Sequence, residues 1–114
     1  MALPSLSKGS TKGELELLQQ QARRASELMK ALSHETRLMI LCLLTEREMS
    51  VSELEQTIGL SQAAVSQQLT RLRLEKLVSA RRDGRQIYYS IVDSEVQIII
   101  ESLYDLFCKP VRNP

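Results

Sequence analysis

Hydrophobic residues recur at helical spacing along most of this chain, and a pattern typical of strands occurs only over residues 77–91. From residue 14 to residue 32, apolar side chains recur every three or four positions, which predicts one long amphipathic helix. Its apolar positions are Leu15, Leu18, Ala22, Ala25, Leu28, Met29 and Leu32. Residues 38–44 (LMILCLL) are apolar almost without interruption, which predicts a buried central helix with Ser33 as its N-cap.

Two short helices separated by a tight turn are predicted next. Ser50 and Glu53 have the spacing of a capping box, and Gly59 tolerates the positive φ that a tight turn after a helix requires. Ser61 is expected to cap the following helix. The buried face of that helix is predicted to be Val65, Leu69 and Leu72.

The opposite face of this helix carries small or polar side chains. They are Gln62, Ala63, Ser66, Gln67, Thr70 and Arg71. Glutamine can bond adenine edges, and small side chains permit close approach to a DNA groove. We therefore predict that these residues read DNA from the second helix of a helix-turn-helix. From this stretch alone, an ordinary helical hairpin with a polar surface is the alternative.

A β-hairpin is predicted after the two short helices. Residues 77–82 and 85–91 flank Asp83-Gly84, a dipeptide typical of two-residue hairpin turns. Arg81, Arg82 and Arg85 would cluster at the tip of this wing, where it can meet a phosphate or the minor groove. A last apolar helix is predicted over residues 93–108.

The predicted fold is mainly α with a β-hairpin wing, that is, a winged helix-turn-helix. We expect a flexible tail over residues 1–12, one DNA-binding and dimerisation domain over residues 13–108, and a C-terminal tail over residues 109–114. The first and last helices are more apolar than so small a domain needs, which predicts a homodimer through both. A dimer would present two reading helices about one DNA turn (~34 Å) apart.

Composition narrows the class of protein further. The 114 residues suffice for one domain, and 43% hydrophobic with 25% charged residues is the ordinary globular range. No apolar run is long enough for a membrane span, and no signal-type segment is seen. Two cysteines do not make a secreted disulfide framework, so we expect a cytoplasmic protein. Because no catalytic constellation is present, an enzyme is not expected.

The net charge of +1 conceals an uneven distribution along the chain. Residues 61–90 hold six basic and two acidic side chains, a net +4, whereas residues 1–60 hold seven basic and eight acidic ones. Positive charge is thus concentrated where DNA phosphates would be contacted. A solvated basic face without a ligand would give the same pattern.

Residues 31–44 (ALSHETRLMILCLL), 50–78 and 81–91 together resemble the ArsR/SmtB family of small bacterial repressors. The resemblance covers roughly residues 28–107. It implies a winged helix-turn-helix dimer that binds double-stranded operator DNA and releases it when an inducer binds. Two positions depart from the family pattern: Gln68 stands where many members carry His, and Glu75-Lys76 replaces Ala-Gly. We expect the first to alter operator preference.

The ligands of the family's metal sites are missing from this sequence. Metal-sensing members carry a Cys-x-Cys pair where this chain has Ser50-Val51-Ser52, and hydroxyls bind soft metals poorly. Members with an interfacial site use Asp and His on the last helix, but no histidine follows Asp93. The sole histidine, His34, fits a surface or capping role better. We therefore predict no metal site and no cofactor.

Cys42 in the central helix and Cys108 at the end of the last helix are the only cysteines. Free cysteines most often simply pack in a core. Their positions nevertheless resemble the persulfide-responsive branch of the family, the BigR/SqrR type. That resemblance implies that Cys42 and Cys108 sense redox state: a persulfide or other reactive sulfur species links them by a disulfide or polysulfide bridge, and DNA is released. It also implies target genes of sulfide oxidation or detoxification.

The residues beside each cysteine bear on its exposure and reactivity. Lys109 and Arg112 are cations near Cys108, and none adjoins Cys42, so we expect Cys108 to be the more exposed thiol. One alternative is a metal-responsive repressor that uses both cysteines in a non-standard site. The other is a constitutive DNA-binding or interaction module in which the cysteines are inert.

Overall fold

The computed structural model describes residues 11–112, and these fall into two units, Met1–Lys30 and Ala31–Pro114. The described part of the first unit belongs to helix α1 (Lys12–Leu32). Thr11 starts this helix, because its Oγ1 accepts a hydrogen bond from the backbone N–H of Glu14 at 3.1 Å. Lys12 is thus the first residue of a helix and not the last of a tail. The rest of the predicted tail, residues 1–10, lies outside the described residues.

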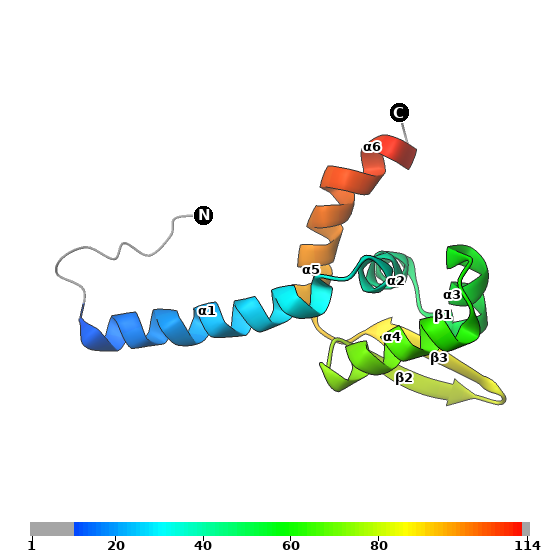
Figure 1. Cartoon of the computed structure of the whole chain (residues 1–114), viewed down its shortest axis with the longest axis horizontal. Coiled ribbons are helices and arrows are strands. Elements are labelled where there is room, and N and C mark those ends of the chain that lie inside the picture. The colour runs from blue at the N-terminus through cyan, green and yellow to red at the C-terminus, as the bar shows by residue number, and fades with distance from the viewer. Residues whose placement is uncertain (1–10, 113–114) are drawn as a thin grey trace. The chain divides into compact units, whose positions relative to one another are not determined.

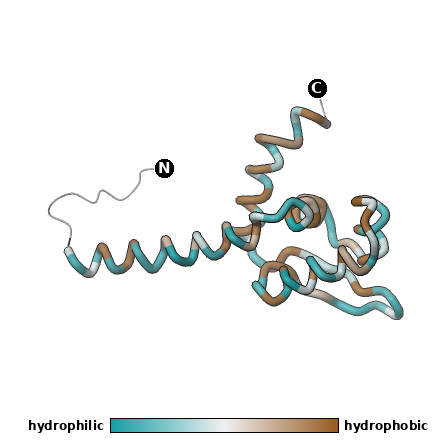
Figure 2. The backbone as a smooth tube through the Cα atoms, viewed as in Figure 1, coloured by the Kyte–Doolittle hydropathy of each residue, from teal (hydrophilic) through white to brown (hydrophobic). Residues whose placement is uncertain are grey.

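Helix α1 has the predicted amphipathic pattern, and Figure 2 shows hydrophobic and hydrophilic residues alternating along it. In the first unit Leu28 is half-buried, and the other large apolar side chains of the helix are solvent-exposed. They are Leu15, Leu17, Leu18 and Met29, with Met29 at 67%. The last two residues of the helix, Ala31 and Leu32, belong to the second unit and are buried there.

The second unit is built around helix α2 (Glu35–Glu46), which contacts α3, α4, α5 and β3 (Figure 1). Ile40, Leu41 and Leu44 are buried, as the apolar run predicts. The helix is not buried on every side, however, because Met39 is exposed and its neighbours on that side are half-buried.

The N-cap of α2 is His34 and not Ser33. His34 has an extended backbone, and its Nδ1 accepts from the N–H of Arg37 at 3.5 Å. Because α1 continues to Leu32, the chain has only two residues in which to turn, and the residue directly before Glu35 becomes the cap.

Helices α3 (Val51–Ile58) and α4 (Gln62–Leu74) form the predicted helix-turn-helix. The Ser50 Oγ accepts from the N–H of Glu53, and a carboxylate oxygen of Glu53 accepts from the N–H of Ser50, both at 3.1 Å, so the capping box is confirmed. Gly59 ends α3 with φ +81°, and Ser61 caps α4. The predicted inward residues of α4, Val65, Leu69 and Leu72, are fully buried.

Strands β2 (Val78–Asp83) and β3 (Gln86–Ile91) form the predicted hairpin. Asp83 pairs with Gln86, so the two-residue loop is Gly84-Arg85, one residue later than expected. Gly84 has φ +64° at the first loop position, where a type II′ turn requires glycine. A short strand that the sequence did not reveal, β1 (Met49–Ser50), pairs with β3 and completes a sheet of order β1-β3-β2.

The last helical stretch changes its winding partway. Helix α5 (Ser94–Leu103) passes into a π-helical segment η1 (Tyr104–Cys108) and then α6 (Lys109–Arg112). The helical path therefore extends four residues into the segment that was expected to be a tail. The two remaining residues of that segment lie outside the described part of the chain. The predicted fold class, mainly α with a β-hairpin wing, is confirmed.

Candidate DNA-binding surface and cysteine pair

The outward face of α4 presents the residues predicted to read DNA. Gln62, Ala63, Gln67, Thr70 and Arg71 are exposed, and Ser66 is half-buried. Two of their side chains are held locally: the Thr70 Oγ1 donates to the Ser66 carbonyl at 2.9 Å, and Arg71 lies 3.4 Å from Glu75. Gln62 and Gln67 are therefore exposed on a helix whose opposite face is buried in the core.

The three arginines of the wing lie in two different environments. Arg81 makes a two-pronged contact with the Glu48 carboxylate, at 2.6–2.9 Å, and lies 4.8 Å from the centre of the Tyr88 ring. The hydrogen bonds from Arg81 lower the pKa of Glu48 below its ordinary value. Arg82, the next residue along β2, points to the opposite face of the hairpin, and Arg85 lies in the loop.

The three wing arginines therefore differ in their partners. Among the described residues, no ion pair involves Arg82 or Arg85. Glu48 already balances the charge of Arg81, and no sequence signal revealed that partner because the contact depends on the unforeseen strand β1 that follows Glu48. Arg82 and Arg85 are the stronger candidates for phosphate contacts.

Cys42 and Cys108 are brought together on one cavity, although they lie far apart in the sequence. Both thiols are half-buried, and Cys108 lies near enough to raise the pKa of Cys42. The π-helical segment η1 brings Cys108 to the cavity that Cys42 also lines. The cavity of about 360 Å³ between α2, α3 and η1 is lined on the α2 side by Leu38, Met39, Cys42 and Leu43.

The other walls of the cavity come from α3 and η1. Thr57 and Ile58 of α3 face Tyr104 and Cys108 of η1, and the acidic side chains of Glu35 and Glu46 stand at the two ends of α2. Sequence reasoning missed this cavity, because its walls are helix faces whose positions depend on the packing of the whole unit.

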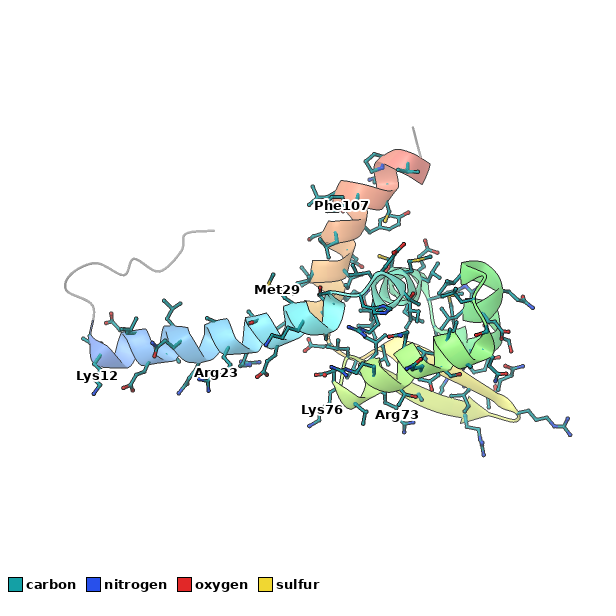
Figure 3. All side chains as sticks on the ribbon, viewed as in Figure 1. Lys12, Arg23, Met29, Arg73, Lys76 and Phe107 are labelled. Carbon is teal, nitrogen blue, oxygen red and sulfur yellow. The ribbon has the colours of Figure 1, made fainter. Side chains whose placement is uncertain are left out.

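The π-helical segment explains why Cys108, and not Phe107, faces the cavity. In a straight α-helix, Phe107 would follow buried Ile100 at a spacing of seven residues and share its face. Because a π-helix has more residues per turn than an α-helix, the residue that shares the face of Ile100 comes about one position later in η1. Phe107 is accordingly 70% exposed (Figure 3), while Cys108 is half-buried beside Cys42.

The environment of Cys42 keeps its thiol protonated. Burial raises the pKa of Cys42 to about 11, and the charge and hydrogen bond of Cys108 add to this effect. Only a thiolate attacks a sulfur electrophile efficiently. Cys42 is therefore poorly suited to react first at neutral pH.

Two of the positions at which metal-sensing members of the family carry ligands hold helix caps in this structure. Ser50 caps α3, and Asp93 caps α5 by accepting from the N–H of Glu95 at 2.8 Å. Within residues 11–112, no group of three or more His, Cys, Asp and Glu side chains is arranged to hold a metal ion. No helix in the described part of the chain is long and apolar enough to cross a membrane.

Comparison with known proteins agrees with this architecture. A model of the bacterial regulatory proteins of the arsR family matches residues 34–80. The biofilm growth-associated repressor of Xylella fastidiosa is 42% identical over 91 residues, which cover 80% of each chain. The crystal structure of the transcriptional repressor BigR from Xylella fastidiosa superposes with a TM-score of 0.77 at 41% identity, covering 83% of this chain and 94% of BigR.

A second similar protein is HlyU of Vibrio cholerae, which is named a transcriptional activator. The structure of reduced HlyU superposes with a TM-score of 0.79 at 39% identity, covering 82% of this chain and 98% of HlyU. Both neighbours are transcription regulators and not enzymes.

A helix-turn-helix followed by a β-hairpin with basic residues defines the winged helix-turn-helix class of DNA-binding regulators. The family model and the sequence identity to known regulators show which family within this class the chain belongs to. This chain belongs to the ArsR family of bacterial regulatory proteins. It is a DNA-binding transcriptional regulator similar to BigR and HlyU.

Proposed function

We propose that this protein is a homodimeric transcriptional repressor that releases its operator when a persulfide links Cys42 to Cys108. The observation that carries the proposal is that Cys42 of α2 and Cys108 of η1 line one cavity, near enough for Cys108 to raise the pKa of Cys42. A disulfide needs Cα atoms about 4.4–6.8 Å apart, and a polysulfide tolerates somewhat more. Two thiols that line the same cavity support such a bridge. The genes it would control are those of sulfide oxidation or detoxification.

The reaction balances with a persulfide, RSSH, as the oxidant. The thiolate of Cys108 attacks the outer sulfur of RSSH, the S–S bond breaks, and RSH leaves after taking up a proton. Cys42 then loses its proton and attacks the Cys108 sulfur, and H₂S leaves as the protein disulfide forms. The two protein thiols lose two electrons, and the transferred sulfur gains them. A second persulfide would leave an extra sulfur in the bridge.

The outward face of α4 and the wing would bind the operator DNA. Gln62, Ala63, Ser66, Gln67, Thr70 and Arg71 would enter the major groove, while Arg82 and Arg85 contact phosphates. Arg81 would add a weaker phosphate contact, because Glu48 competes for it.

Dimerisation would place two copies of α4 on successive major grooves. Exposed apolar side chains on α1 and on the C-terminal helices support an interface through both, and Met29 and Phe107 are examples (Figure 3). A bridge between α2 and η1 would shift the last helix, and so the spacing of the two reading helices.

Operator binding before and after persulfide treatment tests the proposal. We expect wild type to lose affinity at least tenfold, which corresponds to about 1.4 kcal/mol, and Cys42→Ser and Cys108→Ser to keep it. If either variant still releases DNA on treatment, the two-thiol switch is wrong. Titration of the reduced protein with Zn²⁺ is a control, because tight binding that weakens operator affinity would instead indicate a metal sensor.

A further inference from the structure

We propose that the cavity beside the two thiols binds the organic part of the persulfide, and that its ligand is an uncharged persulfide with an apolar substituent. This inference rests on the proposed function and extends it by naming the class of inducer. It is carried by the size, chemistry and position of the cavity.

The cavity is larger than the sulfur chemistry requires. A bridge of one or a few sulfur atoms needs only the space between the two thiols, which line the same cavity. A volume of about 360 Å³ falls instead within the range of roughly 300–1,000 Å³ in which proteins bind small organic molecules. The space beside the thiols can hold a substituent as well as the reacting sulfur.

The walls select for an apolar ligand. Leu38, Met39, Leu43 and Ile58 supply aliphatic surface, and the polar groups of the lining are few. Apolar surface buried by a ligand contributes about 25 cal/mol per Å², so a hydrocarbon or aromatic substituent would gain affinity there. Met39 is flexible and polarizable, and can adapt to the shape of a ring.

The acidic residues select against an anionic ligand. Glu35 and Glu46 are the first and last residues of α2; both are solvent-exposed, and both are among the residues that line the cavity. A carboxylate-bearing persulfide, such as glutathione persulfide, would bring like charges together and lose affinity. A persulfide whose organic substituent carries no carboxylate avoids this repulsion.

The cavity also connects the ligand to the DNA-binding motif. Thr57 and Ile58 form the last turn of α3, directly before the turn residue Gly59 that leads into α4. A substituent held against this turn contacts the helix-turn-helix itself, while its sulfur faces η1.

The test compares rates of bridge formation in the full-length reduced protein, measured by mass spectrometry. Benzyl hydropersulfide, glutathione persulfide and inorganic hydrogen disulfide are the probes, and each rate is divided by that of the same probe with N-acetylcysteine. We expect benzyl hydropersulfide to react about tenfold faster than the other two, the ratio that 1.4 kcal/mol of differential binding gives. Equal normalised rates for the three probes would overturn the proposal.

A matched pair of variants on α3 locates the effect. Thr57→Phe fills the cavity from an exposed position, whereas Gln56→Phe adds the same ring at an exposed neighbour that does not line it. The first should remove the rate advantage of the benzyl probe over hydrogen disulfide, and the second should leave that advantage unchanged. Equal effects of both variants would contradict the site. Glu35→Gln should raise the rate of glutathione persulfide severalfold.

A binding measurement separates this proposal from the thiol switch. Benzyl methyl sulfide has the same ring but no transferable sulfur, and it should raise the Tm of the Cys42→Ser, Cys108→Ser double variant but not of that variant carrying Thr57→Phe. If no rise is seen while persulfides still bridge wild type, the ligand site is wrong and the switch stands. If the rise is seen but no probe forms the bridge, the switch is wrong.

Discussion

Arg37 on α2 donates a hydrogen bond from its Nη1 to the side-chain oxygen of Gln68 in the middle of α4, at 3.1 Å. The Nε of the same guanidinium donates to the Ala31 carbonyl at 2.6 Å. Gln68 therefore points toward α2 and not to the outward face of the reading helix, where a role in operator preference would place it. The contact ties the helix that carries Cys42 to the helix that reads DNA.

Loss of the Arg37–Gln68 bond should destabilise the second unit. We expect Gln68→Ala to lower the free energy of unfolding by about 1–3 kcal/mol, because it removes a hydrogen bond to a charged, partly buried donor. Gln67→Ala, on the neighbouring exposed position, should change it by less than about 0.5 kcal/mol. Urea denaturation at one protein concentration measures both. Equal effects of the two variants would mean that the bond contributes nothing.

Lys76 holds a backbone conformation that favours glycine. With φ +62° it occupies the position after the C-cap of α4, and the N–H groups of Lys76 and Leu77 donate to the carbonyls of Arg73 and Leu72. This is the hydrogen-bond pattern of a Schellman motif. Figure 3 shows Lys76 just past the end of α4.

Lys76→Gly should raise the free energy of unfolding by about 1 kcal/mol, because glycine adopts this conformation without strain. Lys76→Ala keeps the Cβ and should leave stability nearly unchanged. The urea midpoint, at constant slope, is the measurement. A stabilisation by alanine as large as that by glycine would show that strain is not the cause.

Arg82 and Arg85 should contribute to affinity for DNA without regard to its sequence. Replacing either by alanine removes one phosphate contact, so operator and unrelated DNA should both bind more weakly, and the salt slope should fall by about 1. Arg81→Ala should change the slope less, since Glu48 already neutralises that charge. Binding titrations across a range of salt concentrations give the slopes. A loss confined to one operator would contradict the phosphate role.

Alkylation of Cys42 should depend on pH in an unusual range. Its pKa of about 11 keeps it a thiol at neutral pH, so its rate with iodoacetamide should keep rising up to about pH 11. Cys108→Ser removes the smaller, charge-related causes and leaves the burial, so the midpoint should move down but stay above the ordinary value of 9.0. Peptide mass mapping of alkylated Cys42 in both proteins measures the rate at each pH and so the midpoint. An ordinary midpoint in wild type would contradict the buried environment.

The raised pKa of Cys42 also makes the free energy of unfolding fall at high pH. Because the folded pKa of Cys42 lies above its unfolded value, the protonated thiol stabilises the folded state fully below about pH 9. That contribution is lost as pH rises from 9 through 11. Comparison of urea midpoints should therefore show wild type losing stability relative to Cys42→Ala in this window. Parallel profiles for the two proteins would contradict the shift.

What the sequence determined by itself was local and periodic. The spacing of apolar residues predicted α1, the core of α2 and the buried face of α4. The caps at Ser50, Gly59 and Ser61 placed the helix-turn-helix, because a helix end must satisfy its own backbone groups within a few residues. The candidate thiols were also evident from sequence, as the only two cysteines present.

What only the tertiary structure decided depends on contacts between distant segments. The pairing of β1 with β3, the partner of Arg81 and the one-residue shift of the hairpin turn follow from sheet register, which local propensity does not specify. The cavity and the π-helical winding that turns Cys108 toward Cys42 follow from how α2, α3 and α5 pack. Helical periodicity assigns a residue to a face of a straight helix, so it could not foresee the π-helical segment that brings Cys108 to the cavity of Cys42.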